Sequence, residues 1–373
     1  MGRCAAAVLC AIAALAGSSA WADPLRVVSE DIPKQYSTVD FVVHSDRIGR
    51  DFQVTVTSPG ATVFLPGQKL AVIYALDGGD VVAGPMGQNL SNISAMAPAV
   101  IVSIGYPPGQ WDHRLFDLAH HEFQPPAGLP RTGGGGAAFE AFLLQDLKPW
   151  IEAKYPVDST RSVLVGHSAG AVFAANVFAD KPDAFAGYVM ASVPVWSDPS
   201  VVARVKAAAA RAKGERVFLS VAEFDDGANG AHMRAGFDAV AAALAGHPGV
   251  SLKKRVYPGE NHSSYYARLV LDSFPYVLPG VWSKTSPTFP MSPEVLARYT
   301  GVYRTPDGQT ITVRGTSEGQ LTSQVSGGPV APLYPNGRDR FYAPASDIDV
   351  LFDAKGANLS GGGGAKLRIE KTS

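Results

Sequence analysis

The segment Gly166-His167-Ser168-Ala169-Gly170 limits the folds open to this chain more than any other stretch. It follows an apolar, β-branched run at residues 163–165 and leads into an alanine-rich apolar stretch at residues 169–179. A strand that turns at once into a helix holds such a serine in a strained backbone conformation, and the glycines remove Cβ atoms that would clash there. The hydroxyl then stands exposed at the carboxyl edge of a sheet. The segment therefore predicts a strand–turn–helix unit with Ser168 as a nucleophile.

Apolar runs without alternation predict strands that are buried on both faces, as in a parallel sheet. They lie at residues 71–75, 99–103, 162–165, 186–191, 217–221 and 252–257. Helical patterns separate several of these runs, at residues 139–151, 201–213, 231–245 and 263–277. The first of these helices contains Pro149, where we expect a kink. Alternating strands and helices predict an α/β fold with a mainly parallel central sheet, preceded by an antiparallel pair at residues 39–44 and 51–57.

A change of composition near Trp282 predicts a second domain. Residues 283–292 are expected to be a linker, and a short helix is expected at residues 293–299. Short strands separated by turn residues then follow, at residues 301–304, 310–314, 320–324, 339–343, 349–353 and 365–370. We therefore predict an α/β domain at residues 23–282 and a small all-β domain, a barrel or curled sheet, at residues 293–373.

The first 22 residues have the pattern of a secretory signal peptide. Arg3 is the positive charge, residues 5–15 are the apolar core, and Ala20-Trp21-Ala22 is the cleavage site. The apolar run is too short for a membrane anchor, and no other stretch replaces it. We therefore expect a periplasmic or secreted protein. Because Cys4 and Cys10 both lie in this segment, the mature protein would have no thiol for disulfides, metal binding or catalysis.

Charge and glycine spacing argue against several classes of partner. The chain has 32 Lys and Arg against 33 Asp and Glu, a formal net charge of −1, and its basic residues are dispersed. We therefore expect it to bind neither nucleic acid nor an anionic membrane. The runs Gly133–Gly136 and Gly361–Gly364 lack the spacing and the lysine of a phosphate loop, so we expect flexible linkers there.

A serine nucleophile needs a base, and the chain has eight histidines, at positions 44, 113, 120, 121, 167, 232, 247 and 262. His262 is the predicted base, because it follows the last apolar strand and precedes a long helix, which places it at the sheet edge of Ser168. His167 lies along the turn itself and cannot easily reach its neighbour. Residues 120–122 (His-His-Glu) lack the ligand spacing of a known metal motif.

An orienting carboxylate is expected between the nucleophile and the base in the sequence. The strand at residues 217–221 ends in three carboxylates, of which one is needed. Asp225 is our choice, and Glu223 and Asp226 stay open as alternatives.

The oxyanion of an acyl-transfer intermediate needs two N–H donors. The amide of Ala169, directly after the nucleophile, is expected to be one. The other is expected from Gly79, in the loop after an early strand that reads Leu76-Asp77-Gly78-Gly79. A simple tight turn is the alternative there.

The region from about Val39 to Val277 resembles the esterase D-like branch of the α/β-hydrolases, which includes siderophore trilactone hydrolases and mycolyltransferases. The matching stretches are Val72–Gly78, Val102–Pro107, Arg114 with Asp117-Leu118, Lys148–Ile151, Gly166–Gly170 and Pro258–His262. The resemblance supports Gly79 as an oxyanion donor. It also implies that residues 192–197 line the substrate side, although Ser-Val-Pro-Val-Trp-Ser here departs from the family's Ser-Pro-Ser-x-Trp-Trp. Arg114 and Trp196 are accordingly expected to contact substrate.

The tail from about Glu294 to Ser373 resembles the small lipocalin-like β domain that is often fused behind serine hydrolases, including β-lactamase-like enzymes. Residues 299–303 (Tyr-Thr-Gly-Val-Tyr) and 333–335 (Leu-Tyr-Pro) carry this likeness. Residues 251–254 match the S-x-x-K motif of those enzymes, but they lie in a predicted strand, and neither S-D-N nor K-T-G follows. We therefore do not expect β-lactamase chemistry.

Together these residues predict an exported serine carboxylic-ester hydrolase that acts on a small-molecule ester and needs no metal or organic cofactor. Siderophore-type esters are included, although an anionic iron complex would call for a cationic cluster, which Arg114, Arg131 and Lys148 would form if they converged. Two alternatives stay open: an acyltransferase with the same acyl-enzyme, and a non-catalytic binding protein that has kept the fold. Nothing in the sequence indicates an oligomeric state.

Overall fold

The computed structural model of the chain describes residues 36–59, 65–77, 97–110, 113–125, 130–226, 232–278, 289 and 291–372. The predicted signal peptide, Gly79 and most of the predicted linker lie outside the described residues. None of the helices within the described ranges is both long enough and apolar enough to cross a membrane.

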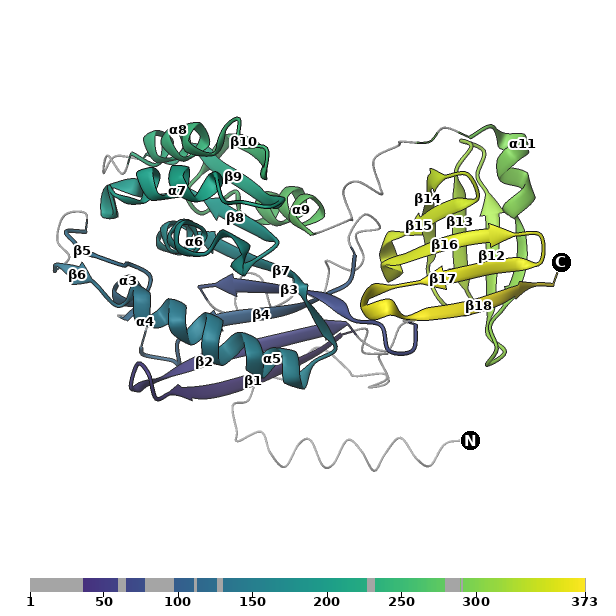
Figure 1. Ribbon diagram of the computed structural model, residues 1–373, viewed down its shortest axis with the longest axis horizontal. Coiled ribbons are helices and arrows are strands. Elements are labelled where there is room, and N and C mark those ends of the chain that lie inside the picture. Colours follow the sequence, from purple (N-terminus) through teal and green to yellow (C-terminus); the bar gives the residue numbers. More distant parts are fainter. Residues whose placement is uncertain are drawn as a thin grey trace, which may run out of the picture. The chain divides into compact units, whose positions relative to one another are not determined.

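A mostly parallel sheet of eight strands forms the centre of the first domain (Figure 1). The strands are β1 (Tyr36–Ser45), β2 (Arg50–Pro59), β3 (Leu70–Leu76), β4 (Ala99–Gly105), β7 (Val157–His167), β8 (Gly187–Ala191), β9 (Glu215–Phe224) and β10 (Val250–Asn261). They lie in the order β1–β2–β4–β3–β7–β8–β9–β10. Strand β2 pairs antiparallel with β1 and with β4, and all the other neighbours are parallel. The predicted α/β fold is confirmed.

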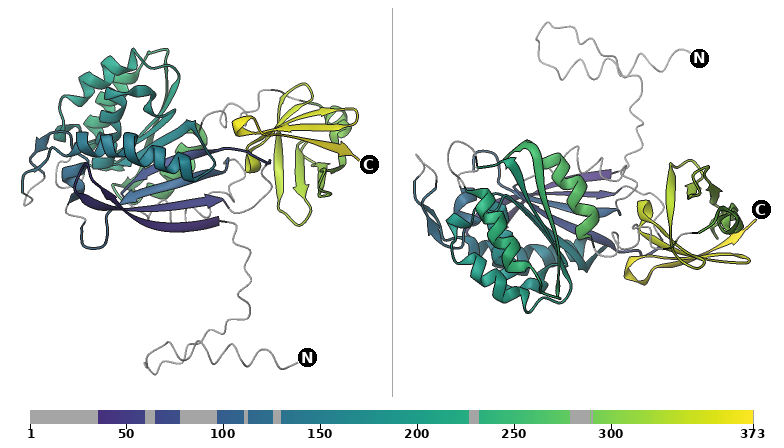
Figure 2. Two further views of the ribbon diagram at one scale, coloured as in Figure 1. Left: turned by 60° about the horizontal axis from the view of Figure 1, so that its bottom comes forward. Right: turned by 90° about the horizontal axis from the view of Figure 1, so that it is seen from above.

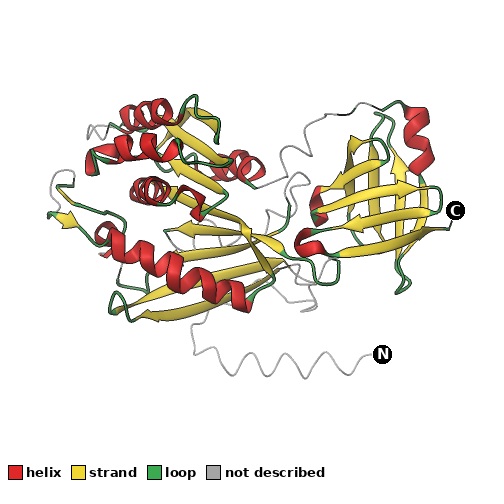
Figure 3. Ribbon diagram, viewed as in Figure 1, coloured by secondary structure: helices red, strands yellow, loops and turns green. Residues whose placement is uncertain are grey.

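Helices cover both faces of this sheet (Figures 2 and 3). They are α3 (Arg114–Asp117), α4 (Gly136–Ala141), α5 (Lys148–Lys154), α6 (Ala169–Asp180), α7 (Val201–Ala209), α8 (Met233–Leu244) and α9 (Tyr266–Val277). Alternate side chains of a strand pack on opposite faces of the sheet. Tyr74 of β3 belongs to the same hydrophobic cluster as the buried residues of α6, whereas Ile73 belongs to the same cluster as those of α9. Burial on both faces explains why the inner strands have apolar runs without alternation.

Two details of these elements differ from prediction. The run at residues 252–257 is not buried on both faces, because β10 is an edge strand and most of its side chains are at least partly exposed. The helix around Pro149 widens to a π-helical segment at Phe142–Leu147, and Pro149 then lies in the first turn of α5. A missing N–H is tolerated at that position.

The prediction of a flexible linker at Gly133–Gly136 was wrong. Gly133 belongs to β6 (Thr132–Gly133), which pairs with β5 (Glu122–Phe123), and Gly136 begins α4. A Cβ atom on Gly135 would lie 2.6 Å from the ring of Phe116, so the glycines serve close packing rather than flexibility. Gly362–Gly364 likewise form a 3₁₀ turn between two strands of the second domain.

The second domain is a closed antiparallel barrel of eight strands (Figure 3). Helix α11 (Pro293–Leu296) precedes β11 (Gly301–Arg304), β12 (Thr310–Gly315), β13 (Leu321–Val325), β14 (Val330–Gly337), β15 (Arg340–Ala343), β16 (Ile348–Asp353), β17 (Gly356–Ser360) and β18 (Lys366–Lys371). The predicted barrel is confirmed, but β14 and β17 were missed. Strand β14 contains Pro332 and Pro335, which weaken a strand signal in the sequence.

Candidate active site

Ser168 occupies the sharp turn between β7 and α6, with φ 57° and ψ −122°. Its backbone N–H donates to the carbonyl of Ala191 at the end of β8, 2.9 Å away. The turn brings Gly166 against the next helix, where a Cβ atom would lie 2.0 Å from the carbonyl oxygen of Gly170. Only glycine fits there, so the pattern G-x-S-x-G is a steric requirement of this geometry. Ala169 is the first residue of α6, where backbone N–H groups lack an intrahelical acceptor.

His262 directly follows β10 and contacts the first carboxylate after β9. Its Nδ1 lies 2.6 Å from Oδ1 of Asp225. The pairing register of β9 and β10 shifts between Tyr257 and Asn261, which changes the direction of the chain just before His262. With Asp225 ionised, Nδ1 carries the proton and donates it to the carboxylate, which leaves Nε2 as the acceptor. This is the tautomer that a base facing a serine needs.

The carboxylate of Asp225 is buried and is held by two further groups. Its Oδ2 accepts hydrogen bonds from Oγ of Ser192 and from the backbone N–H of Ala222, at 2.5 and 3.1 Å. Because the only proton of the Ser192 hydroxyl goes to Asp225, the hydroxyl of Tyr265 donates to Oγ of Ser192. Burial alone would raise the pKa of Asp225, but the hydrogen bonds from His262, Ser192 and Ala222 outweigh burial and lower it.

Ser192 was expected only as part of the segment 192–197 on the substrate side, and its bond to Asp225 was not predicted. It directly follows β8, and β8 lies between β7, which carries Ser168, and β9, which precedes Asp225. The carboxyl ends of neighbouring parallel strands lie at the same edge of a sheet. The position of Ser192 directly after a predicted strand could therefore have indicated that it lies near Ser168 and Asp225. Its positive φ of 56° marks the same turn in the structure.

The three carboxylates at the end of β9 have different partners. Glu223 is exposed and accepts a hydrogen bond from the backbone N–H of Gly259, 2.7 Å away. Asp226 accepts one from the backbone N–H of Arg234, 3.0 Å away. Asp225 is the carboxylate that is bonded to His262. The geometry thus favours Asp225 over the two alternatives.

Ser168, Ala169, Asp225 and His262 lie together in the wall of a cavity of about 450 Å³. Small-molecule sites usually measure about 300–1,000 Å³. Most of the other described lining residues are apolar, and they are Leu115, Ala119, Phe123, Pro125, Val172, Pro194, Trp196, Phe224 and Met233. The ring of Trp196 packs edge-on against that of Phe123, with centroids 5.7 Å apart. The structure therefore places Trp196 in the wall of the cavity that also contains Ser168.

Arg114 is not among the described residues that line this cavity. Its guanidinium makes a bidentate pair with Asp77 and donates to the carbonyl of His167. Asp77 has a φ of 74° and is the last described residue before the segment with Gly79, which lies outside the described residues. Arg114 thus anchors the entry to the proposed oxyanion loop and touches the backbone next to Ser168.

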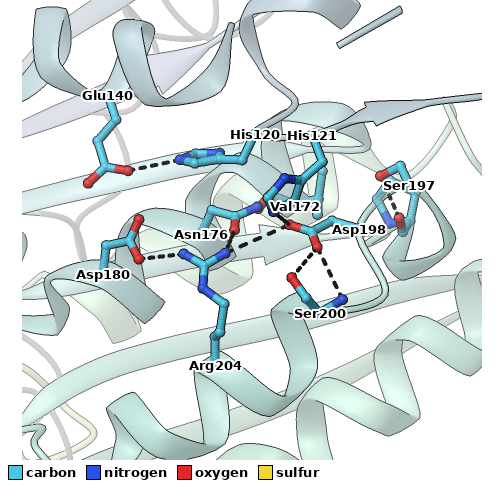
Figure 4. A network of polar contacts seen from close by, with 11 residues as sticks. His120, His121, Glu140, Val172, Asn176, Asp180, Ser197, Asp198, Ser200 and Arg204 are labelled. Atoms are coloured by element: carbon cyan, nitrogen blue, oxygen red, sulfur yellow. Dashed lines mark hydrogen bonds and ion pairs between the residues drawn. The ribbon is translucent and has the colours of Figure 1, made fainter. Parts of the chain in front are cut away.

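A polar network supports the wall that carries Trp196 (Figure 4). Asp198, two residues further along, is 3% exposed, and its Oδ1 accepts from both N and Oγ of Ser200. Burial tends to raise the pKa of Asp198, but hydrogen bonds from Ser200 and Asn176 and the nearby His121 lower it. His121 lies 4.0 Å from Asp198, so the network reaches the segment that leads to Phe123.

Arg204 of α7 supplies the positive charge of this network. Its Nη1 donates to Oδ1 of Asn176 and lies 3.9 Å from Asp198, and its Nη2 donates to Asp180. Ligand atoms of His120, Glu140 and Asp180 lie within 4.8 Å of one another, a spacing that could hold a metal ion. Because the guanidinium already neutralises Asp180 and His120 already bonds to Glu140, we assign no metal to this group (Figure 4).

His167 packs its ring against that of His262, with centroids 4.5 Å apart. Burial, reinforced by the proximity of His262, lowers the pKa of His167 from 6.5 to about 4. His167 is therefore neutral at neutral pH, and it adds no positive charge beside His262.

Replacing His167 with glutamine is expected to make folding stability less sensitive to acid. Between pH 6.5 and 4 the unfolded chain binds a proton at His167 that the folded chain does not bind, so stability falls as the pH falls. The group accounts for about 2 kcal/mol of the loss between pH 7 and pH 4.5. Urea unfolding at these two pH values should show a smaller loss for His167→Gln than for the wild type.

The exposed His232 provides a matched control for this measurement. Its replacement by glutamine should leave the acid-induced loss of stability close to that of the wild type. If His167→Gln lost as much stability on acidification as the wild type does, the neutral buried state of His167 would be wrong.

The sequence matches a family model described as "Putative esterase" over residues 45–327. Ferri-bacillibactin esterase BesA of Bacillus subtilis is 30% identical over 179 residues, which are 43% of this chain and 60% of that protein. The siderophore triacetylfusarinine C esterase of Aspergillus fumigatus is 33% identical over 101 residues, 26% of this chain and 34% of that protein. The matches thus span about three fifths and about one third of these relatives.

Solved structures share the fold of the first domain. The BES protein from Bacillus cereus superposes with a TM-score of 0.58 at 23% identity, over 69% of this chain and 99% of that chain. The siderophore hydrolase EstA from Aspergillus nidulans gives 0.55 at 20% identity, over 68% and 96% of the two chains. At these identities the likeness shows the fold alone.

Proposed function

This chain belongs to the putative esterase family, and we propose that it is a serine carboxylic-ester hydrolase that works through an acyl-enzyme on Ser168. The observation that carries the proposal is the contact between His262 Nδ1 and buried Asp225, in the wall of the cavity that also contains Ser168. A nucleophile, a base and an orienting acid are what acyl transfer from an ester requires.

In the first half-reaction, Oγ of Ser168 attacks the ester carbonyl carbon while Nε2 of His262 takes the hydroxyl proton. Asp225 accepts the Nδ1 hydrogen bond and stabilises the imidazolium that forms. The tetrahedral intermediate collapses as the bond to the alcohol oxygen breaks, and His262 gives its proton to the departing alcohol. The acyl group is then an ester of Ser168.

The second half-reaction repeats these steps with water. The oxygen of a water molecule attacks the acyl carbon while His262 takes a proton from that water. The bond between the acyl carbon and Oγ of Ser168 then breaks. His262 then returns the proton to Ser168, and the carboxylic acid leaves.

The negative charge of each tetrahedral intermediate needs two donors. We assign one to the backbone N–H of Ala169 at the N-terminus of α6, where the helix dipole also favours an anion. The other is assigned to Gly79. Arg114, rather than binding substrate, would position this loop through its pair with Asp77.

The proposed substrate is a small-molecule ester. The relatives named above are siderophore esterases, which supports this class without identifying the compound. An acyltransferase would use the same acyl-enzyme but would pass the acyl group to an alcohol instead of water. We also propose export to the periplasm or the medium, from the signal-peptide pattern of residues 1–22.

Labelling of the exported protein with a fluorophosphonate tests this function. Peptide mapping should find one phosphonyl group on Ser168 and none on Ser197, another serine of the cavity wall, whose hydroxyl donates to the carbonyl of Pro194. The intact mass should fit a chain that begins at Asp23. Folded protein whose Ser168 stays unlabelled would instead favour the binding-protein alternative, and transfer products on addition of alcohols would favour an acyltransferase.

A further inference from the structure

We propose that the cavity beside Ser168 receives an uncharged, apolar or aromatic part of the ester and discriminates against anionic esters. This inference rests on the proposed function, because it names the substrate class of the same site. It goes beyond what the relatives' names state, since those names give siderophore esters as substrates and say nothing of charge.

The charge of the cavity wall is the first observation. Among the described residues that line it, there is no lysine or arginine, whereas Asp225 and Asp226 both contribute carboxylates. Asp225 is hydrogen-bonded to His262, whereas Asp226 is bonded to a backbone N–H and, within the described ranges, makes no ion pair. An anionic group that entered this cavity would therefore meet a negative charge without a cation to offset it.

Three segments that lie outside the described residues and adjoin the site in the sequence also lack basic residues. Residues 78–96, 126–129 and 227–231 adjoin lining or active-site residues in the sequence. None of the three contains a lysine or an arginine, and the first contains one acid, Asp80.

The cations that could have served an anionic substrate have partners elsewhere. Arg114 pairs with Asp77, and Arg131 pairs with Glu122, 3.3 Å away. Lys148 donates to Oγ of Ser162 and lies over the ring of Phe185. The convergence that an anionic iron complex would require is therefore absent among these three described residues.

The shape and chemistry of the apolar wall suit a flat ring. Phe123 and Trp196 meet edge to face, which offers an incoming aromatic group both a ring edge and a ring face. Phe224, on the same wall, is 61% exposed. An apolar group held here would cover it.

Two pairs of esters, matched except for one carboxylate, test the inference. p-Nitrophenyl benzoate and p-nitrophenyl 4-carboxybenzoate differ in the acyl part, whereas benzyl acetate and 4-carboxybenzyl acetate differ in the alcohol part. At pH 7.5 and constant ionic strength, kcat/KM for the neutral member should exceed that for the anionic member at least about tenfold in one pair or both. Both pairs are tested because the proposal assigns the cavity to one part of the ester without choosing between the acyl part and the alcohol part.

A charge change in the wall should then reduce the preference. Asp226→Asn is expected to raise kcat/KM for the anionic member and to lower the neutral-to-anionic ratio about three- to tenfold. Asp238→Asn is the matched control, because it removes an equal charge from an exposed residue of α8 that is not among the described residues lining the cavity. The ratio should stay near the wild-type value in this control.

The outcomes separate the two proposals. A ratio near one, or a preference for the anionic ester, in both pairs overturns the inference while Ser168-dependent hydrolysis keeps the proposed function. An equal change of the ratio in Asp226→Asn and Asp238→Asn overturns the role given to the cavity wall. If Ser168-dependent hydrolysis is absent for every ester, the proposed function fails and the inference falls with it.

Discussion

Ser168→Ala is expected to lower kcat for p-nitrophenyl butanoate by about 10⁴-fold or more while the protein stays folded. The substitution removes the oxygen that forms the acyl-enzyme and leaves the base, the acid and the oxyanion donors in place. Residual hydrolysis then depends on binding and on stabilisation of the oxyanion. Initial rates at saturating ester, corrected for hydrolysis in buffer, measure the effect.

Two controls make this result specific. Thermal unfolding should show a melting temperature close to that of the wild type, because the variant would keep the backbone turn and the N–H bond to the carbonyl of Ala191. Ser197→Ala removes another hydroxyl from the same cavity wall and should have a far smaller effect on kcat. Retention of more than about a tenth of the wild-type kcat in folded Ser168→Ala would rule out the acyl-enzyme on this residue.

The parts of the fold that the sequence predicted are those that depend on neighbours along the chain. The turn at Ser168 could be predicted because a Cβ atom on Gly166 would clash with Gly170 and Ala171, which are its near neighbours along the chain. The inner strands could be predicted because burial on both faces leaves an unbroken apolar run. Strand β14 was missed because Pro332 and Pro335 obscure its strand pattern, although its partners β13 and β15 are its neighbours along the chain.

Contacts between distant residues explain what the sequence did not reveal in the site. Arg114 was expected at the substrate, but its partner Asp77 is 37 positions away, and no local pattern indicates the pair. The choice among the three carboxylates depends in the same way on Ser192 and Tyr265, which lie directly after β8 and directly before α9. The order of residues in the sequence limited the orienting carboxylate to three candidates. The hydrogen bond from Ser192, which Tyr265 supports, distinguishes buried Asp225 from the other two.

Asp225→Asn is expected to lower kcat by about 10⁴-fold, nearly as much as the loss of the nucleophile. Oδ2 of Asp225 accepts from Oγ of Ser192 and from the backbone N–H of Ala222, so an amide oxygen would occupy that position. The amide NH₂ would then face Nδ1 of His262 and donate to it. His262 would carry its proton on Nε2, the atom that must accept the proton of Ser168, and the base would be blocked.

The neighbouring carboxylates provide matched controls for the same measurement. Glu223→Gln and Asp226→Asn each remove one acid from the end of β9 without touching the bond between His262 and Asp225, so each should change kcat by less than about tenfold. A larger loss in Glu223→Gln or Asp226→Asn than in Asp225→Asn would transfer the role of the acid to that residue, since the tautomer of His262 would then depend on a different carboxylate.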